Sequence, residues 1–194
     1  MVLTGILLAA GRGRRFDPEG SRNKLLQPLP GGERVVAASA RLLLSCCSRV
    51  VAVVPPGDGG VAGLLRGLGC EVTVCPDADT GMGVSLAHAV RHAVRHALPA
   101  EGWLVALGDM PFVQASTLAA LRDAVLGGAG IAVPVHGGRR GNPVAFGPCH
   151  REALLAMHGD QGARRLLLAH PVHEVAVADP GILRDIDTAA DLPA

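Results

Sequence analysis

The sequence predicts an α/β protein of three layers, in which helices cover both faces of a mostly parallel β-sheet. Along its 194 residues, short apolar runs rich in β-branched residues alternate with segments of helical period. Such alternation is typical of parallel sheets that are buried on both faces. Hydrophobic residues make up 49% of the chain and aromatic residues only 2%, so Leu, Val and Ala must build the core of this fold.

The individual elements follow from the periodicity of the apolar residues. Seven apolar segments are predicted as strands: Val2–Ala9, Arg49–Val54, Glu71–Cys75, Trp103–Leu107, Gly130–Val135, Pro143–Phe146 and Val172–Val177. Seven segments with helical spacing are predicted as helices: Arg34–Ser45, Gly60–Leu68, Val84–Ala97, Gln114–Leu126, His150–Met157, Gly162–Ala169 and Thr188–Leu192. The length suits a single domain, which we expect to span residues 1–194.

Charge and hydropathy argue against two classes of partner. The formal net charge is +1, which disfavours a nucleic-acid surface or a polybasic membrane patch. No apolar run approaches the ~20 residues of a membrane span, and Met1–Ala10 is a poor signal peptide. The five cysteines form no CxxC motif, and their odd number argues against a disulfide framework. We therefore expect a cytoplasmic protein.

Lys24 is the only lysine beside seventeen arginines, which suggests a position that needs a compact ammonium rather than a planar guanidinium. It follows a predicted strand that runs into a loop containing Gly11, Gly13 and several arginines. Free backbone N–H groups surrounded by cations are what a polyphosphate requires. The loop matches neither the P-loop nor the dinucleotide fingerprint, and a solvated basic loop is the alternative interpretation.

Carboxylates lie at the ends of other segments. Asp109 follows the predicted strand 103–107, and ligands of such sheets bind beyond the carboxyl ends of strands. A carboxylate there is well placed to hold Mg²⁺, which prefers oxygen ligands and phosphates. Asp185 and Asp187 share one face if their segment is extended, and one of them could complete a Mg²⁺ site with Asp109. The alternatives are that Asp109 caps a turn and that Asp187 and Thr188 cap the last helix.

The segment Gly81–Leu86 opens the predicted helix 84–97. Ser85 and the free N–H groups of this helix start are positioned to contact a ligand. An ordinary helix cap is the other interpretation.

Several segments together resemble the molybdenum cofactor nucleotidyltransferases, specifically the molybdopterin cytidylyltransferase branch. They occur in the family's order and are Leu8–Phe16 with Lys24–Leu26, Gly81–Leu86, Gly108–Pro111, Arg140–Pro143, Gly159–Arg164 and Asp185–Thr188. They span nearly the whole chain and are specific as a set. The loop departs from the family pattern at Phe16, where Met is commoner, and at Asp17, where Gly often follows.

The resemblance implies a Rossmann-like nucleotidyltransferase fold. It also implies transfer of a nucleoside monophosphate from a triphosphate to a phosphorylated acceptor, with release of pyrophosphate. The cytidylyl branch is similar to this chain at Ala9-Ala10-Gly11, which implies CTP as the donor and a molybdopterin-type acceptor. A molybdoenzyme or its maturation chaperone is then a further expected partner.

An acceptor phosphate is already anionic, so we expect catalysis by positioning and charge neutralisation without a general base. Arg15 and Lys24 are the predicted catalytic residues, and Asp109 and Asp187 the predicted Mg²⁺ ligands. The predicted nucleotide-binding residues are Leu8, Ala9, Ala10, Gly11, Arg12, Gly13, Arg14, Pro55, Gly81 and Ser85. On the resemblance alone, Asn142 and Arg164 are expected on the acceptor side.

Two other functions stay open at this stage. One is a guanylyl- or cytidylyltransferase that acts on another phosphorylated small molecule. The other is a module that binds a nucleotide or cofactor without chemistry, against which the joint presence of Lys24, Asp109 and Asp187 argues.

Overall fold

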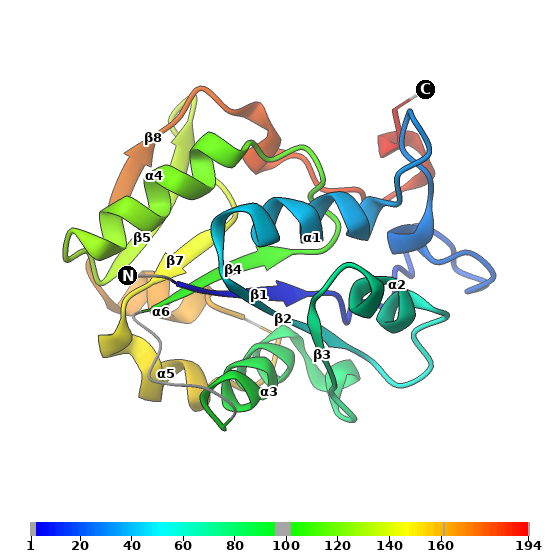
Figure 1. Ribbon diagram of the computed structural model, residues 1–194, viewed down its shortest axis with the longest axis horizontal. Helices are drawn as coiled ribbons and strands as arrows, with labels where there is room; N and C mark the ends of the chain where they lie inside the picture. Colours follow the sequence, from blue (N-terminus) through cyan, green and yellow to red (C-terminus); the bar gives the residue numbers. More distant parts are fainter. Residues whose placement is uncertain (1–2, 96–101, 161, 194) are drawn as a thin grey trace.

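One mixed sheet of eight strands runs through the centre of the computed structural model, which describes residues 3–95, 102–160 and 162–193 (Figure 1). The strands are β1 (Thr4–Leu8), β2 (Arg49–Val54), β3 (Glu71–Val74), β4 (Trp103–Leu107), β5 (Ile131–His136), β6 (Arg139–Arg140), β7 (Val144–Phe146) and β8 (His173–Ala176). Their spatial order is β3-β2-β1-β4-β7-β5-β6, with β8 beside β5. β7 runs antiparallel to both β4 and β5, whereas β1 to β4 pair in parallel.

The seven predicted strands are therefore confirmed within the described residues; Val2 lies outside them. Sequence reasoning missed β6, because a strand of two exposed arginines has no apolar signal. β6 pairs with β5 in an antiparallel hairpin.

The helices are α1 (Val35–Cys46), α2 (Val61–Gly67), α3 (Met82–Arg95), α4 (Ala115–Leu126), α5 (Arg151–Leu155) and α6 (Arg164–Ala169). Short 3₁₀ helices are η1 (Lys24–Leu26), η2 (Ala78–Thr80), η3 (Pro148–His150), η4 (Pro180–Leu183) and η5 (Ala189–Asp191). The predicted last helix is thus a single 3₁₀ turn. α3 begins earlier than predicted, because Gly81 and Gly83 weaken the helical signal of its first turn; the predicted end of this helix, Ala97, lies outside the described residues.

The helices form two layers, with α1, α2 and α4 on one face of the sheet and α3, α5 and α6 on the other (Figure 1). Alternate residues of a strand point to opposite faces. In β1, the fully buried Ile6 packs into the core on the α3 side, and the fully buried Leu7 packs into the core on the α1 side. The predicted three-layer α/β fold is confirmed. Among the described residues, no helix has both the length and the apolarity needed to cross a membrane.

The sheet reverses its order between β1 and β4. The chain passes from β1 to β2 and β3 on one side and then returns to place β4 on the other side of β1. Leu8 at the end of β1 lies beside Leu107 at the end of β4. Such a reversal opens a crevice at the carboxyl ends of the two strands, where α/β proteins bind ligands.

Candidate functional site

A cavity of about 650 Å³ lies at this crevice. Its walls come from the loop after β1, the turn before α3, the end of β4 and the segment after η4. The residues that line it are Leu8, Ala10, Gly11, Arg12, Gly13, Arg14, Arg15, Lys24, Ala78, Asp79, Gly81, Met82, Ser85, Leu107, Asp109, Asp160, Asp185 and Asp187. We call this space the nucleotide cavity, after the ligand that the sequence analysis predicts for its residues.

The loop after β1 packs closely against the Lys24 side chain. Gly13 has a φ of +60°, a conformation that favours glycine, and a Cβ there would lie 3.3 Å from Cγ of Lys24. Lys24 begins η1, which is capped by the side chain of Asn23 accepting a hydrogen bond from the Leu25 N–H at 3.0 Å. Gly13 and Asn23 thereby direct a nearly buried lysine into the cavity.

The irregular part of this loop, residues 16–22, is closed on itself. Phe16 is buried in the core on the α1 side. The Asp17 carboxylate accepts hydrogen bonds from the Ser21 hydroxyl and the Arg22 N–H, both at 2.7 Å. The Ser21 hydroxyl, followed by the Arg22 N–H, lowers the pKa of Asp17. The two residues that depart from the family pattern, Phe16 and Asp17, therefore anchor the loop to the core and to itself.

Lys24 joins the two predicted metal ligands. Its Nζ lies 2.5 Å from Oδ2 of Asp109 and 3.2 Å from Oδ1 of Asp187. The Lys24 side chain is only 9% exposed, and the two carboxylates are about one-fifth exposed. A guanidinium nitrogen of Arg15 lies 2.8 Å from the other oxygen of Asp187, although Arg15 itself is 78% exposed. Four residues that the sequence singled out thus form one charged cluster.

The backbone holds the two carboxylates together. The Gly108 N–H donates to the Leu8 carbonyl at 2.9 Å, and the Ile186 N–H donates to the Asp109 carbonyl at 2.9 Å. Ile186 is fully buried, so its neighbours Asp185 and Asp187 both reach the cavity. Burial, followed by the nearby charge of Asp187, raises the pKa of Asp185.

Asp191, the third carboxylate near the end of the chain, has a capping role. It accepts hydrogen bonds from the N–H groups of Asp187 and Thr188, at 3.1 and 2.7 Å. Thr188 is the cap of η5, with Asp191 completing a capping box. Thr188 therefore caps η5, while its neighbour Asp187 lines the cavity.

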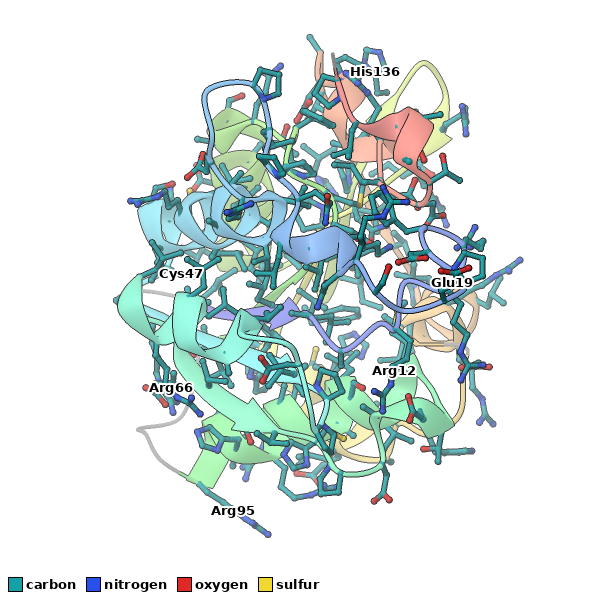
Figure 2. All side chains as sticks on the ribbon, turned by 90° about the vertical axis from the view of Figure 1, so that its right-hand side faces the viewer. Arg12, Glu19, Cys47, Arg66, Arg95 and His136 are labelled. Carbon is teal, nitrogen blue, oxygen red and sulfur yellow. The ribbon has the colours of Figure 1, made fainter. Side chains whose placement is uncertain are left out.

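On the opposite wall, Arg12 reaches across the mouth of the cavity to Asp79 in η2. The two side chains form a bidentate pair with both distances 2.6 Å. Hydrogen bonding to Arg12, reinforced by its charge, lowers the pKa of Asp79. Figure 2 shows Arg12 on the side of the loop that faces α3, and Glu19 at the outer end of the same loop. The pair ties the glycine loop to the turn that begins α3.

The start of α3 packs backbone to backbone against residues 158–160. The Gly83 N–H donates to the Gly159 carbonyl at 2.8 Å. A Cβ on Gly81 would lie 2.3 Å from the Gly159 carbonyl, and Gly81 has a φ of +139°. Only glycine permits this approach. It carries Asp160 into the wall of the nucleotide cavity.

Most, but not all, of the predicted site residues meet here. Twelve of them line the cavity, whereas Ala9, Pro55, Asn142 and Arg164 do not. Ala9 and Pro55 are buried, and Asn142 lines a separate small pocket together with Pro143. Arg164 is exposed at the start of α6.

Sequence reasoning missed five residues of the cavity and left Asp185 as an alternative. The missed residues are Ala78, Asp79, Met82, Leu107 and Asp160. Asp79 lies just before the segment Gly81–Leu86, and Asp160 lies within the segment Gly159–Arg164. An isolated aspartate has no pattern that marks it as part of a site. Only the packing of α3 against residues 158–160 brings Asp160 to the cavity.

The carboxylates suit a hard divalent cation. Within residues 3–95, 102–160 and 162–193, no group of three or more His, Cys, Asp or Glu is arranged to hold a metal ion. Asp109 and Asp187 nevertheless present oxygens to one shared position, the Nζ of Lys24. Mg²⁺ commonly binds through one or two carboxylates together with waters and substrate phosphates. The donor set fits such an ion.

The fold and the cavity define an α/β protein with a polar ligand site at the switch point of its sheet. The model of the MobA-like NTP transferase domain family matches residues 5–175, so the chain belongs to that family. It is therefore a nucleotidyltransferase-family protein.

Two curated relatives illustrate the breadth of the likeness. The bifunctional protein GlmU of Bradyrhizobium sp. is 34% identical over 152 residues, which are 73% of this chain but 30% of that protein. The chain thus spans less than one-third of the length of this relative. The nicotine blue oxidoreductase of Paenarthrobacter nicotinovorans is 29% identical over 98% of this chain and 94% of its own length.

Solved structures share the architecture across the whole chain. Rv0371c from Mycobacterium tuberculosis H37Rv matches with a TM-score of 0.80 and 28% identity, covering 98% of this chain and 96% of its own. Its complex with manganese has a TM-score of 0.77 at 27% identity and the same coverage. Molybdopterin-guanine dinucleotide biosynthesis protein A from Archaeoglobus fulgidus, at 20% identity, covers 98% of this chain and 95% of its own with a TM-score of 0.66, which shows a shared fold.

Proposed function

We propose that the protein transfers CMP from CTP to the terminal phosphate of a molybdopterin-type acceptor and releases pyrophosphate. The observation that carries this proposal is the convergence of Lys24, Asp109 and Asp187 beneath the glycine loop. Membership of an NTP transferase family supplies the donor class. The choice of CTP rests on the resemblance at Ala9 and Ala10, and the choice of acceptor rests on the resemblance of the whole motif set.

The charges of the cavity support a metal-dependent reaction. Four cationic and five acidic side chains line it. A nucleoside triphosphate is strongly anionic, so the two carboxylates beside Lys24 would repel it unless a cation intervened. Asp109 and Asp187 would hold Mg²⁺, which would supply positive charge to offset that of the phosphates. The manganese complex of the related Rv0371c supports a divalent metal in this fold.

The residues of this chain then position and neutralise the reacting groups. An oxygen of the acceptor phosphate attacks the α-phosphorus of CTP in line, a new P–O bond forms, and the bond to the β-phosphate breaks. The N–H groups of the loop from Gly11 to Gly13 would bind the phosphates. Lys24 and Arg15 would offset the negative charge that gathers on the leaving pyrophosphate. The acceptor phosphate is anionic throughout, so no side chain needs to remove a proton.

A pyrophosphate-release assay tests the proposal. The full chain is incubated with Mg²⁺, molybdopterin and each of CTP, GTP and ATP in turn. We expect pyrophosphate with CTP alone. Release with GTP alone would overturn the cytidylyl assignment and favour a guanylyltransferase. Release with CTP only when another phosphorylated small molecule replaces molybdopterin would overturn the acceptor.

A non-catalytic module that binds nucleotide is the remaining alternative. It predicts saturable binding of CTP in calorimetry without pyrophosphate release under any acceptor. The joint presence of Lys24, Asp109 and Asp187 in one cluster argues against this function, because a module that only binds nucleotide could do without them.

A further inference from the structure

A second cavity lies between α5 and α6, on the same face of the sheet as α3 (Figure 1). Its volume is about 860 Å³, which falls within the usual range of small-molecule sites. The residues that line it are Ala153, Ala156, Met157, His158, Gly159, Asp160, Gly162, Arg165, Leu166 and Ala169. We call it the α5–α6 groove. The proposed reaction, as described above, uses residues of the nucleotide cavity only.

The groove borders the nucleotide cavity. Asp160 lines both spaces. The hydrogen bond from the Gly83 N–H to the Gly159 carbonyl, together with the close approach at Gly81, holds the wall between them against α3. A molecule that lies in the groove would therefore be next to the cavity where the triphosphate would bind, with Asp160 at the border of the two spaces.

The side chains of the groove suit a flat organic molecule. Met157 and the buried Leu166 supply an apolar surface, and thioethers make favourable contacts with aromatic rings. Arg165 is exposed and makes no ion pair with any residue that the structure describes. A guanidinium stacks on planar rings and also pairs with anionic oxygens. His158 and Asp160 add hydrogen-bonding groups at the end nearer to α3.

We propose that the α5–α6 groove receives the organic body of the phosphorylated acceptor, a planar nitrogen-rich ring system, and that Arg165 determines its binding. This inference rests on the proposed nucleotidyl transfer. The acceptor phosphate passes Asp160 and meets the α-phosphate of the donor in the nucleotide cavity. Met157 and Leu166 contact the ring, and Arg165 contacts its face or its polar edge.

Arg165 and its neighbour Arg164 differ in their access to the groove. Resemblance placed Arg164 on the acceptor side, but Arg164 lines neither the groove nor the nucleotide cavity. Arg165, one position later, lines the groove. Consecutive residues of a helix point in different directions, so the two arginines serve as each other's comparison.

The first experiment measures binding of pterin-6-carboxylate, a fluorescent planar heterocycle with one anionic group. Wild-type protein is compared with Arg165→Glu, Arg164→Glu and Arg151→Glu, the last an exposed arginine of α5 outside the groove. We expect saturable binding to wild type and at least about tenfold weaker binding to Arg165→Glu, because the variant replaces attraction with repulsion. Arg164→Glu and Arg151→Glu should bind as wild type does.

Two results would overturn the inference. One is the lack of saturable binding to wild type at up to about 1 mM probe, a concentration at which even weak specific ligands bind. The other is equal binding to wild type and Arg165→Glu. Circular dichroism of each variant shows whether it is folded, and Arg165→Lys, which keeps the charge but not the planar fork, should bind with intermediate affinity.

A second measurement separates this inference from the proposed function. Calorimetry with CTP and Mg²⁺ should give the same affinity for wild type and Arg165→Glu, because Arg165 does not line the nucleotide cavity. If the probe binds as expected but no acceptor yields pyrophosphate, the transfer proposal fails and the groove is a binding site. If transfer occurs and the acceptor KM is unchanged in Arg165→Glu, the groove assignment fails and the transfer proposal stands.

Discussion

The nucleotide cavity and the α5–α6 groove are adjacent, yet they are built by different means. In the nucleotide cavity, charged side chains from three distant segments contact one another, as Lys24, Asp109 and Asp187 do. The groove is formed by two short helices, an apolar surface and a backbone contact to α3. The first site depends on charges whose type and spacing are visible in the sequence. The second depends on shape, which appears only when the chain is folded.

Lys24→Ala and Asp109→Asn provide the largest expected contrast between the two sites. Each should lower kcat for pyrophosphate release by at least about 10²-fold, because each removes a group that offsets transition-state charge. Even Lys24→Arg should be damaging, since a planar fork replaces a compact ammonium between two carboxylates. Steady-state assays measure the effect, with pterin-6-carboxylate binding as the control that should not change. Near-wild-type turnover of Lys24→Arg would contradict the role given to the ammonium.

Gly81→Ala should damage both sites at once. Its Cβ would meet the Gly159 carbonyl at 2.3 Å, and its φ is unfavourable for alanine. We expect a loss of about 2 kcal/mol in the free energy of unfolding, from backbone strain and overpacking. In a chain of this size the loss lowers Tm by about 4–8 °C in a thermal scan.

Gly63→Ala is the matched control for this variant. Gly63 lies in α2, and apart from its chain neighbours and the adjacent backbone of that helix, no heavy atom lies within 4 Å of the position its Cβ would take. Alanine in a helix should leave Tm unchanged or raise it slightly. Equal Tm values for wild type and Gly81→Ala would show that the wall between the two sites tolerates movement.

Lys24→Met should strengthen binding of Mn²⁺ in the absence of nucleotide while abolishing turnover. Lys24 occupies the position shared by Asp109 and Asp187, so a cation that binds both carboxylates must displace its ammonium. Removing that competitor should increase the affinity by about tenfold, measured by electron paramagnetic resonance of free Mn²⁺. Weaker Mn²⁺ binding by this variant would show that the metal uses other residues. Arg15→Met, which alters an exposed partner of Asp187, gives the comparison for a change of charge alone.

The pair of Arg12 and Asp79 should have the smallest effect. Both side chains are substantially exposed, and exposed ion pairs contribute little. Asp79→Asn should raise the KM for CTP by less than about fivefold and leave the acceptor KM unchanged. The difference in KM between wild type and Asp79→Asn should disappear at high salt, where screening removes the attraction between Arg12 and Asp79. A large change in kcat would instead place Arg12 among the residues that act in the transition state.

The sequence allowed the fold and the charged part of the site to be predicted, because both have local signals. Apolar periodicity located the strands, and the placement of Asp109 and of the glycine loop before Lys24 after two of them indicated one shared site. β6 and Asp160 could not be predicted. A strand of two exposed arginines has no apolar pattern, and Asp160 reaches the cavity only through the backbone contact of Gly83 with Gly159.

Resemblance and geometry also diverge at single residues. The segment 159–164 resembles a family motif, but its Arg164 lines neither cavity, whereas Arg165 just beyond it lines the groove. A sequence motif locates a segment, and helix geometry decides which of its side chains reaches the site.

The contact between Lys24 and Asp187 has a consequence for synthesis of the protein. The two residues are 163 positions apart, and chains emerge from the ribosome N-terminal part first. A nascent chain that has exposed β1 to β4 already carries the glycine loop, Lys24 and Asp109. The segment that brings Asp187 emerges much later, held to Asp109 through the Ile186 N–H. The complete charged cluster can therefore form only after all the described strands of the sheet, β1 to β8, have been synthesised.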